Sequence, residues 1–453
     1  MVTKDITGNL TLKQKIMIVL ALAIPAMIEN ILQTVVGFVD TLFVAKLGVI
    51  EVTAVGIANA VLAVYIALFM ALSVGTSSLI ARRIGAEDIE GAKTIARNAT
   101  WISLLIGLIL GVVTFFFNEP LLQIMGASDE VIGVAVPYFK IVGIPAFLIS
   151  FMFTFGSILR ATGDTKTPMT VSIWINVLHI VLDYLLIFGI GKFAGLGVEG
   201  AAWATVIVRL IGAIRLFQHI QRSEVAFNLL KAVIPDSNKW TRELLKVSLP
   251  TAAERLIMRM GQVLYFGLIV RIGTETYAAH TMAGNIEAFA YMPGYGLAVA
   301  ATTLVGQCYG AEKFKEARSY GYITSIIGII FMAIIGAIIF VLAPWLASWF
   351  TTDPTILDMV VTALRISAVS QPALAIGLVL AGALQGLGDT KSPMYSTAIG
   401  MWIIRIIGVY ILGIHLNLGI AGVWYAIIID YFARAFFLAW KFNRHFRVIK
   451  NEE

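Results

Sequence analysis

The sequence predicts an all-α membrane protein with twelve transmembrane helices, arranged as two six-helix bundles. Three observations predict this fold class: the composition, a series of long apolar segments, and an internal repeat that relates the two halves of the chain. Of the 453 residues, 59% are hydrophobic and only 13% are charged, whereas soluble domains carry roughly 25% charged residues. Too few polar side chains remain to cover a water-soluble fold of this length.

The apolar segments are long enough to cross a lipid bilayer. A hydrocarbon layer of about 30 Å requires about 20 predominantly apolar residues per helix. Charged, glycine-rich or proline-rich breaks separate twelve such segments along the chain. The predicted spans are 14–42, 52–80, 96–117, 131–158, 168–190, 196–218, 243–270, 277–306, 318–343, 356–384, 393–415 and 418–440.

The distribution of basic residues predicts the orientation of these spans. A net charge of +6 is compatible with nucleic-acid binding, but most of the 33 Lys and Arg residues lie in segments that a single membrane orientation places on the same side. The opposite loops contain only Lys46, Lys192 and Arg271. Because basic residues concentrate in cytoplasmic loops, we expect both termini in the cytoplasm and no nucleic-acid partner. The N-terminus has no pattern of a removable signal peptide.

An internal repeat divides the predicted spans into two equal sets. G-D-T-K-T-P-M at 163–169 recurs as G-D-T-K-S-P-M at 388–394, and Pro25-x-x-x-Glu29 recurs as Pro250-x-x-x-Glu254. Each half has six spans and therefore the same orientation, which predicts parallel repeats around a central cavity that opens alternately to either side. Glycine and aspartate favour turns, so we interpret the G-D-T-K segments as turns, with a gating role as the alternative. The predicted domains are an amino-terminal lobe (1–218), a cytoplasmic linker (219–242) and a carboxy-terminal lobe (243–453).

The first span carries a polar stripe. Glu29, Gln33, Gly37 and Asp40 are spaced at intervals of a helical turn, so all four lie on one face. Ionisable groups within a membrane are costly and usually face a cavity or a partner. Pro25 removes one backbone hydrogen bond and allows the helix to bend below the stripe. We therefore expect this face to contact an ion or a substrate.

The fifth span has a comparable polar face formed by Asn176, His179 and Asp183. At a rise of about 1.5 Å per residue, Asp183 and Asp40 lie at similar depths, roughly 9–14 Å from the outer ends of their spans. If the two carboxyl groups meet, burial and like charge favour uptake of a proton by one of them, which would allow coupling to an ion gradient. The alternative is that each acid is hydrogen-bonded separately within its bundle.

The second half lacks a deep carboxylate at the position equivalent to Asp40. Its spans instead contain several arginines, and Asp430 and Arg434 are neighbours on a helix face that we expect to pair. Glu254 and Glu287 are candidates to neutralise Arg255 or Arg259, and we favour structural pairing over substrate contact for these groups. At the positions equivalent to Glu29, Gln33, Gly37 and Asp40, this half has Glu254, Met258, Gln262 and Tyr265.

Methionines and aromatic residues concentrate in the seventh and eighth spans. Flexible methionines adapt to varied apolar ligands, and aromatic rings hold organic cations. Lipid contact and helix packing account for the same composition. The candidate substrate contacts here are Met258, Met282, Met292 and Tyr265.

Several classes of function are disfavoured by what the sequence contains. The single Cys308 excludes an intramolecular disulfide and, without a Cys/His cluster, a zinc site. No phosphate-binding loop or nucleotide motif is present, which disfavours an enzyme or an ATP-driven pump. No repeated pore-filter signature supports a channel. A purely structural membrane protein would not explain the stacked acidic residues of the first span.

The motifs collected above resemble the multidrug and toxic compound extrusion (MATE) family, and within it the DinF-like branch. The resemblance extends over all twelve predicted spans. The segments that carry it are I-P-A-M-I-E-N at 24–30, V-D-T-L-F-V-A-K-L-G at 39–48, L-R-A-T-G-D-T-K-T-P at 159–168, L-D-Y-L-L-I-F-G at 182–189 and G-A-A-W-A-T at 200–205.

The resemblance implies a two-lobed antiporter that exports chemically diverse compounds, and it assigns residues to the coupling site. Asp40 matches the coupling aspartate of the first span, Asp183 the aspartate of the fifth, and Thr205 the threonine of the sixth. Where the family commonly has asparagine, this chain has His179, and Asn176 lies one turn earlier. Sodium requires several oxygen ligands and imidazole offers nitrogen, so this difference favours protons.

We therefore expect a proton-coupled exporter of cationic or amphiphilic aromatic compounds in the cytoplasmic membrane of a prokaryote. Outside protons would neutralise Asp40 and release the drug, with Gln33 and Gly37 beside it. We expect a monomer that has no cofactor other than an ion gradient, with lipid, protons and small molecules as its partners. The alternatives are a sodium-coupled multidrug antiporter and a flippase for lipid-linked precursors, which would favour a strongly cationic cavity.

Overall fold

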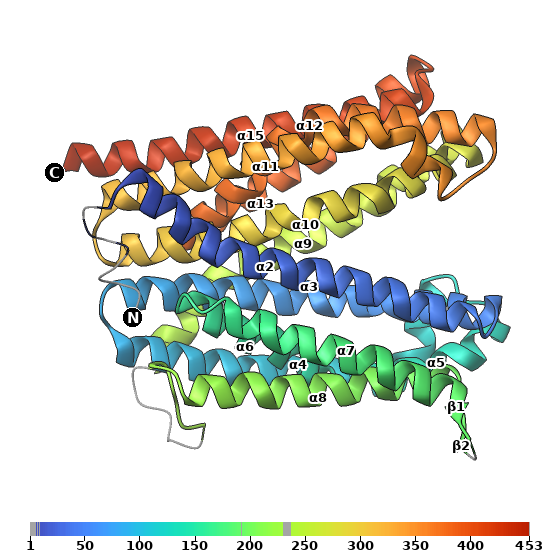
Figure 1. The fold of residues 1–453 in the computed structure, drawn as a ribbon, viewed down its shortest axis with the longest axis horizontal. Coiled ribbons are helices and arrows are strands. Elements are labelled where there is room, and N and C mark those ends of the chain that lie inside the picture. The colour runs from blue at the N-terminus through green and yellow to red at the C-terminus, as the bar shows by residue number, and fades with distance from the viewer. Residues whose placement is uncertain (1–5, 7, 9, 192, 230–236, 453) are drawn as a thin grey trace. The chain divides into compact units, whose positions relative to one another are not determined.

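The computed structural model describes residues 6, 8, 10–191, 193–229 and 237–452, and it is almost entirely helical (Figure 1). Residues 230–236 of the predicted linker lie outside the described part. The only strands in the described residues form a two-stranded antiparallel hairpin, in which Gly189 pairs with Ala194 and Ile190 with Phe193. The elements of the first half of the chain, in order, are α2 (Leu12–Ala45), α3 (Val49–Gly85), α4 (Ile89–Ile124), α5 (Asp129–Gly143), α6 (Ala146–Ala161), α7 (Lys166–Phe188), β1 (Gly189–Ile190), β2 (Phe193–Ala194) and α8 (Val198–Gln221).

The second half repeats this arrangement of long helices without a hairpin. Its elements are α9 (Ser237–Ile272), α10 (Thr274–Gly310), α11 (Phe314–Ser348), α12 (Pro354–Gly386), α13 (Lys391–Ala398), η1 (Ile399–Arg405), α14 (Ile406–Gly408), η2 (Val409–His415) and α15 (Gly419–Glu452). The all-α membrane fold predicted from the sequence is thus confirmed. Most helices extend several residues beyond the predicted spans, because helical structure continues into the polar residues that flank each apolar segment.

Ten helices in the described residues are long and apolar enough to cross a membrane, and the α5–α6 pair is an eleventh candidate. Helix α9 has 36 residues but is not among them. It occupies the predicted seventh span and carries Glu254, Arg255 and Arg259 near its middle. These charged residues make α9 less apolar than the helices that are counted as membrane spans.

The predicted span 131–158 contains a break. Two helices, α5 and α6, meet there at an angle of 46°. Pro145 precedes the first residue of α6 and has no backbone N–H to continue the hydrogen bonds of α5. The chain therefore breaks at Pro145.

The eleventh predicted span, 393–415, is also less regular than predicted. Two π-helical stretches, η1 and η2, flank the single turn α14. In a π-helix each N–H bonds to the carbonyl five residues earlier, which widens the helix and redirects its side chains. Arg405, the last residue of η1, points into the packed interior and is 5% exposed.

By their internal contacts, the described residues form two compact units. We name them the carboxy unit (Met1–Met27, Ile84–Glu87 and Ala253–Glu453) and the amino unit (Ile28–Arg83 and Asp88–Ala252). The division passes through α2 two residues after Pro25 and through α9 two residues after Pro250. The repeated proline therefore marks the same position in both halves, where one helix leaves one unit and enters the other.

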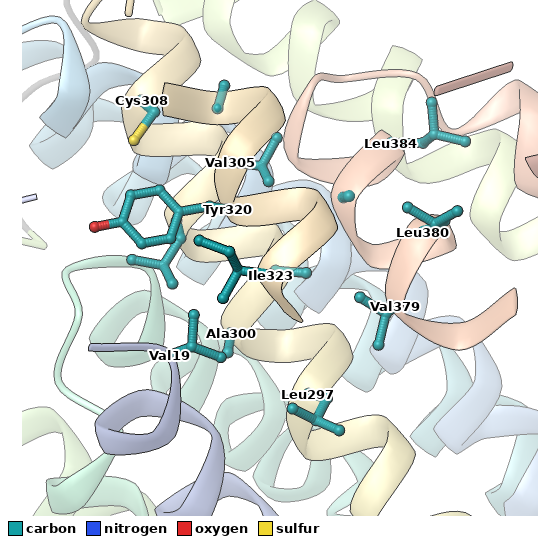
Figure 2. Close-up of a cluster of buried hydrophobic side chains, with 14 of the residues drawn as sticks. Val19, Leu297, Ala300, Val305, Cys308, Tyr320, Ile323, Val379, Leu380 and Leu384 are labelled. Carbon is teal, nitrogen blue, oxygen red and sulfur yellow. The ribbon is translucent and has the colours of Figure 1, made fainter. Parts of the chain in front are cut away.

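Each unit has its own apolar core. In the carboxy unit, Val19 of α2 packs with Leu297 of α10, Ile323 of α11 and Val379 of α12 (Figure 2). Cys308, the only cysteine, is fully buried in this cluster. In the amino unit, α3, α5 and α6 supply Ala, Val, Leu and aromatic side chains to a second cluster. These cores hold the helices that carry the polar groups described below.

The two G-D-T-K segments form equivalent turns, which confirms the structural interpretation of this motif. Gly163 and Gly388 have φ angles of 90° and 83°. The Asp164 carboxylate accepts a hydrogen bond from the Thr167 N–H (2.9 Å), and the Asp389 carboxylate accepts one from the Ser392 N–H (3.0 Å). Each aspartate thus satisfies one N–H in the first turn of the following helix.

Replacing Gly163 with alanine is expected to destabilise the protein by about 1–2 kcal/mol, because a Cβ is disfavoured at a left-handed φ. Gly388→Ala is expected to have an effect of similar size, since the two turns have the same geometry. Thermal unfolding in detergent measures both. Gly377→Ala in α12 is the control, because a Cβ there meets no atom within 4 Å. Equal melting temperatures for all three variants would contradict the prediction.

Candidate functional site

A cluster of ionisable and polar side chains lies within the amino unit. Four helices supply it: α2, α5, α7 and α8. Each member has an electrostatic interaction or a polar contact with at least one other member. We refer to it as the buried polar cluster, and its members are Asp40, Tyr138, His179, Asp183, Thr205 and Arg209.

Helices α7 and α8 present their polar residues to each other. His179 and Asp183 lie one turn apart on α7, and Thr205 and Arg209 lie one turn apart on α8. The β1–β2 hairpin connects the two helices, which run antiparallel and pack along their length. His179 Nε2 lies 3.2 Å from Thr205 Oγ1, so the two polar rows meet at this pair.

The hydrogen bonds of Thr205 define the role of His179. The Thr205 hydroxyl donates its proton to the Ala201 carbonyl (2.9 Å), so Thr205 Oγ1 can only accept from the imidazole. His179 Nε2 therefore carries a proton and donates it to Thr205. The same nitrogen lies 3.4 Å from Asp183 Oδ2. A protonated Nε2 has no free lone pair and cannot serve as a metal ligand. In this respect His179 differs from a residue with an oxygen donor at the same position.

The two acidic residues predicted for ion coupling both belong to the cluster. Asp183 is 0% exposed, and its two carboxylate oxygens have no hydrogen-bond partner among the described residues. Asp40 is half-buried, and its buried Oδ1 likewise lacks a partner within the described part of the chain. The carboxyl groups interact electrostatically. The structure therefore brings together two acids that lie far apart in the sequence.

Arg209 and Tyr138 belong to the cluster but were not predicted as site residues. Arg209 interacts electrostatically with Asp40 and with Tyr138, and the Tyr138 hydroxyl donates to Asn59 Oδ1 of α3 (3.4 Å). A signal for Arg209 was present, because it is a charged residue within a predicted span, one turn after Thr205. No comparable signal identified Tyr138, which looks like one of many aromatic residues in a helix.

The remaining predicted residues of the amino unit lie around this cluster. Asn176 donates to Ser172 Oγ on its own helix (3.2 Å). Gln33 and Gly37 are exposed on α2 between Glu29 and Asp40, and a Cβ at Gly37 would meet no atom within 4 Å. The face of α2 that carries the polar stripe is thus open beside Asp40 at these two positions.

Glu29, at the start of the stripe, has a different environment from Asp40. Arg160 of α6 donates to both carboxylate oxygens at 3.1 Å. Both side chains are largely buried, at 14% and 15% exposed. A carboxylate held by a guanidinium in this way is neutralised within the protein. Asp40, the other acid of this stripe, has no such ion pair within the described part of the chain.

The candidate substrate residues of the carboxy unit lie in or beside its core. Tyr265 is 4% exposed, and its hydroxyl lies 3.5 Å from His280 Nε2. Met258 and Met282 pack against the same core cluster, and Met292 is half-buried. These side chains therefore contribute to the packing of α9 and α10.

A second buried charge network lies in the carboxy unit. Asp430 is 0% exposed and binds Arg434, which confirms the predicted pair. Arg405 also binds Asp430, with its Nε at 2.9 Å. Glu287 accepts a hydrogen bond from Ser367 (2.9 Å) and interacts electrostatically with Arg405. This last interaction differs from the expected pairing of Glu287 with Arg255 or Arg259.

The contacts of Glu254, the other predicted acid of this half, agree in part with the expected pairing. Its Oε1 accepts a hydrogen bond from Thr397 (2.9 Å), and it interacts electrostatically with Arg255. Arg259 donates to Gln262 on the same helix (3.3 Å). The charged residues predicted within the spans of the carboxy unit thus have partners in the fold, with Arg365 held over the Phe340 ring, whereas Asp40, Asp183 and Arg209 have unsatisfied buried atoms.

A repeated helical bundle that keeps partly unsatisfied acids within its spans defines the class of membrane transporters. Comparison with known proteins identifies the family. The sequence model of the MatE family matches residues 25–185 and 250–411, and the chain belongs to this family. The two matched segments begin at Pro25 and Pro250, the prolines of the internal repeat.

Individual relatives agree with this assignment. The chain is 33% identical to a probable multidrug resistance protein, NorM, of Thermotoga maritima over 93% of this chain and 92% of the relative. A crystal structure of MATE in complex with MaD3S superimposes with a TM-score of 0.91 and 28% identity, covering 99% of both chains. An outward-facing multidrug resistance MATE transporter gives 0.90 and 27%, covering 99% of this chain and 98% of the other.

Proposed function

We propose that this protein is a proton-coupled exporter of cationic or amphiphilic aromatic compounds, and that the buried polar cluster is its coupling site. The observation that carries the proposal is the convergence of Asp40 and Asp183: Oδ1 of Asp40 and both carboxylate oxygens of Asp183 are buried without a hydrogen-bond partner among the described residues. The relatives described as multidrug resistance proteins support a role in drug export. The exporter resides in a prokaryotic cytoplasmic membrane with both termini in the cytoplasm.

The charges of the cluster support exchange of one cation at a time. With neutral His179, two ionised aspartates and one guanidinium leave a net charge of −1. One proton, or one cationic drug, restores neutrality. A proton bound from outside would therefore displace a cationic drug from Asp40, and loss of that proton to the cytoplasm would reset the carrier.

The energetics of such an exchange are adequate for export. Exchange of one proton for one monovalent cationic drug moves no net charge, so the pH gradient supplies the driving force. Each pH unit corresponds to about 1.4 kcal/mol and to a tenfold concentration ratio. For an uncharged drug, the proton's charge adds about 2.3 kcal/mol for every 100 mV of membrane potential.

Pro25 is proposed as the conformational element of the cycle. It lies buried in α2, and the division between the two units falls immediately after it. A proline within a helix leaves one carbonyl without its usual partner and allows bending there. A bend at Pro25 would move Asp40 relative to the start of the same helix.

A flippase for lipid-linked precursors is less well supported than drug export. It would use a set of free cationic groups to bind phosphates, but Arg405 and Arg434 both bind Asp430. Arg255 interacts with Glu254 and with Tyr295. The arginines of the carboxy unit therefore serve mainly to neutralise acids within the fold.

Transport by the purified protein in liposomes tests the proposal. A cationic aromatic dye, ethidium, is followed while either a pH gradient or a sodium gradient is imposed at a clamped membrane potential. We expect the pH gradient to drive dye movement in sodium-free buffer. Movement driven only by sodium at equal pH would contradict the proposed ion, and lipid scrambling without dye transport would contradict the proposed substrate.

A further inference from the structure

Arg209 is the most unusual member of the buried polar cluster. It lies within α8, and its Nη1 is buried without a hydrogen-bond partner among the residues that the structure describes. A buried guanidinium with an unsatisfied donor is costly in a membrane. Packing alone would be served better by an apolar side chain, so the position requires another explanation.

The neighbours of Arg209 are the other ionisable groups of the cluster. It interacts electrostatically with Asp40 of α2, Tyr138 of α5 and His179 of α7. Asp183 of α7 interacts with Asp40 and with Tyr138. Helix α6 also packs against α8, but its Arg160 is bound to Glu29. Arg209 is therefore the positive charge that faces Asp40 in this cluster.

A fixed positive charge affects sodium and protons differently. Sodium must remain an ion in the site, so a neighbouring guanidinium repels it. A proton instead bonds to one carboxylate oxygen and removes that negative charge, so it needs no shell of oxygen ligands. His179 Nε2, which donates to Thr205, also withholds a ligand from sodium.

We propose that Arg209 is the ion-specificity residue of the coupling site: its guanidinium supplies a fixed positive charge to the cluster that contains Asp40, so that the site accepts one proton and rejects sodium. This inference rests on the proposed function of the cluster as the coupling site. It also fits the charge count, because removal of Arg209 would change the net charge of the cluster from −1 to −2 and so favour binding of an additional cation.

Arg209→Gln tests this inference in the reconstituted full-length protein. We expect the variant to bind radioactive sodium at equilibrium about tenfold more tightly than the wild type, or more, and to show dye efflux driven by a sodium gradient at equal pH. Arg209→Lys keeps the charge and is expected to exclude sodium like the wild type. Arg215→Gln, on the exposed side of the same helix, is the matched control and should behave like the wild type.

The possible outcomes separate this inference from the proposed function. If Arg209→Gln remains insensitive to sodium in binding and transport, Arg209 does not determine ion choice, although proton coupling stands. If Arg209→Lys binds sodium, the positive charge at this position is not what excludes sodium. This variant tests the role of the charge even where Arg209→Gln does not fold. Sodium-driven efflux by the wild type would overturn both proposals. Sodium binding requires no transport, so it tests Arg209 even if no gradient drives efflux.

Discussion

Replacing Asp40 with asparagine is expected to abolish dye efflux driven by a pH gradient, to the level of protein-free liposomes. The amide has nearly the same shape as the carboxyl group but cannot bind and release a proton between pH 5 and 9. Asp40 interacts electrostatically with Arg209 and with Asp183, and its neutralisation changes the net charge of the cluster from −1 to 0, so that the cluster no longer attracts a cationic drug. Transport in proteoliposomes, with and without an imposed gradient, measures the effect.

Two controls make this result specific. Glu199→Gln removes a carboxylate that is exposed at the start of α8, and it should transport like the wild type. The melting temperature of Asp40→Asn should equal or exceed that of the wild type, because the half-buried Asp40 has a buried oxygen without a partner in the described residues. Unchanged efflux by a folded Asp40→Asn protein would exclude Asp40 from the mechanism.

The fold could be predicted from the sequence because the membrane imposes a simple rule on length and polarity. Apolar segments such as 52–80 and 318–343 correspond to the single helices α3 and α11. The rule says nothing about backbone geometry within a segment. The break at Pro145 and the π-helical turns around Arg405 both lie inside predicted spans, because an apolar sequence can satisfy its hydrogen bonds in more than one helical form.

The site could be predicted only in part, since helical periodicity identifies faces but not their partners. The spacing of His179 and Asp183 placed them on one face of α7, which the structure shows. Which helix lies opposite depends on packing, so the approach of Asp40, Tyr138 and Arg209 to these residues was not available from spacing. For the same reason, spacing could not show that Arg160 of α6 neutralises Glu29.

The two halves use buried charge in different ways, although they share a repeat. In the amino unit, Asp40 and Arg209 keep unsatisfied atoms within a polar cluster. In the carboxy unit, Asp430 is held by Arg405 and Arg434 with several direct bonds. The first arrangement suits a group that exchanges its partner, and the second suits a fixed structural link between η1 and α15. This asymmetry supports the proposal that cation exchange takes place in the first half of the chain.

Asp430→Asn is expected to have the largest effect on stability of any single change considered, about 3–5 kcal/mol, because it leaves buried arginines without their counter-charge. Arg405 Nη2 lies 2.7 Å and Arg434 Nε 2.6 Å from the carboxylate. The helix backbone also approaches closely, since a Cβ at Gly400 would overlap Asp430 Oδ1. The fold is therefore built around this carboxylate, and thermal unfolding in detergent measures its loss.

Arg434→Gln is expected to cost less, about 1–2 kcal/mol, because Asp430 would keep its contacts with Arg405, which lies 5.2 Å from the Tyr431 ring and 5.6 Å from the Tyr265 ring. Asp358→Asn, at an exposed position of α12, should change stability by less than about 0.5 kcal/mol. The order of the three variants distinguishes the physical causes. If Asp430→Asn were no worse than Arg434→Gln, the buried positive charge would already be balanced by another acid, and Glu287, which interacts with Arg405, would be the group responsible.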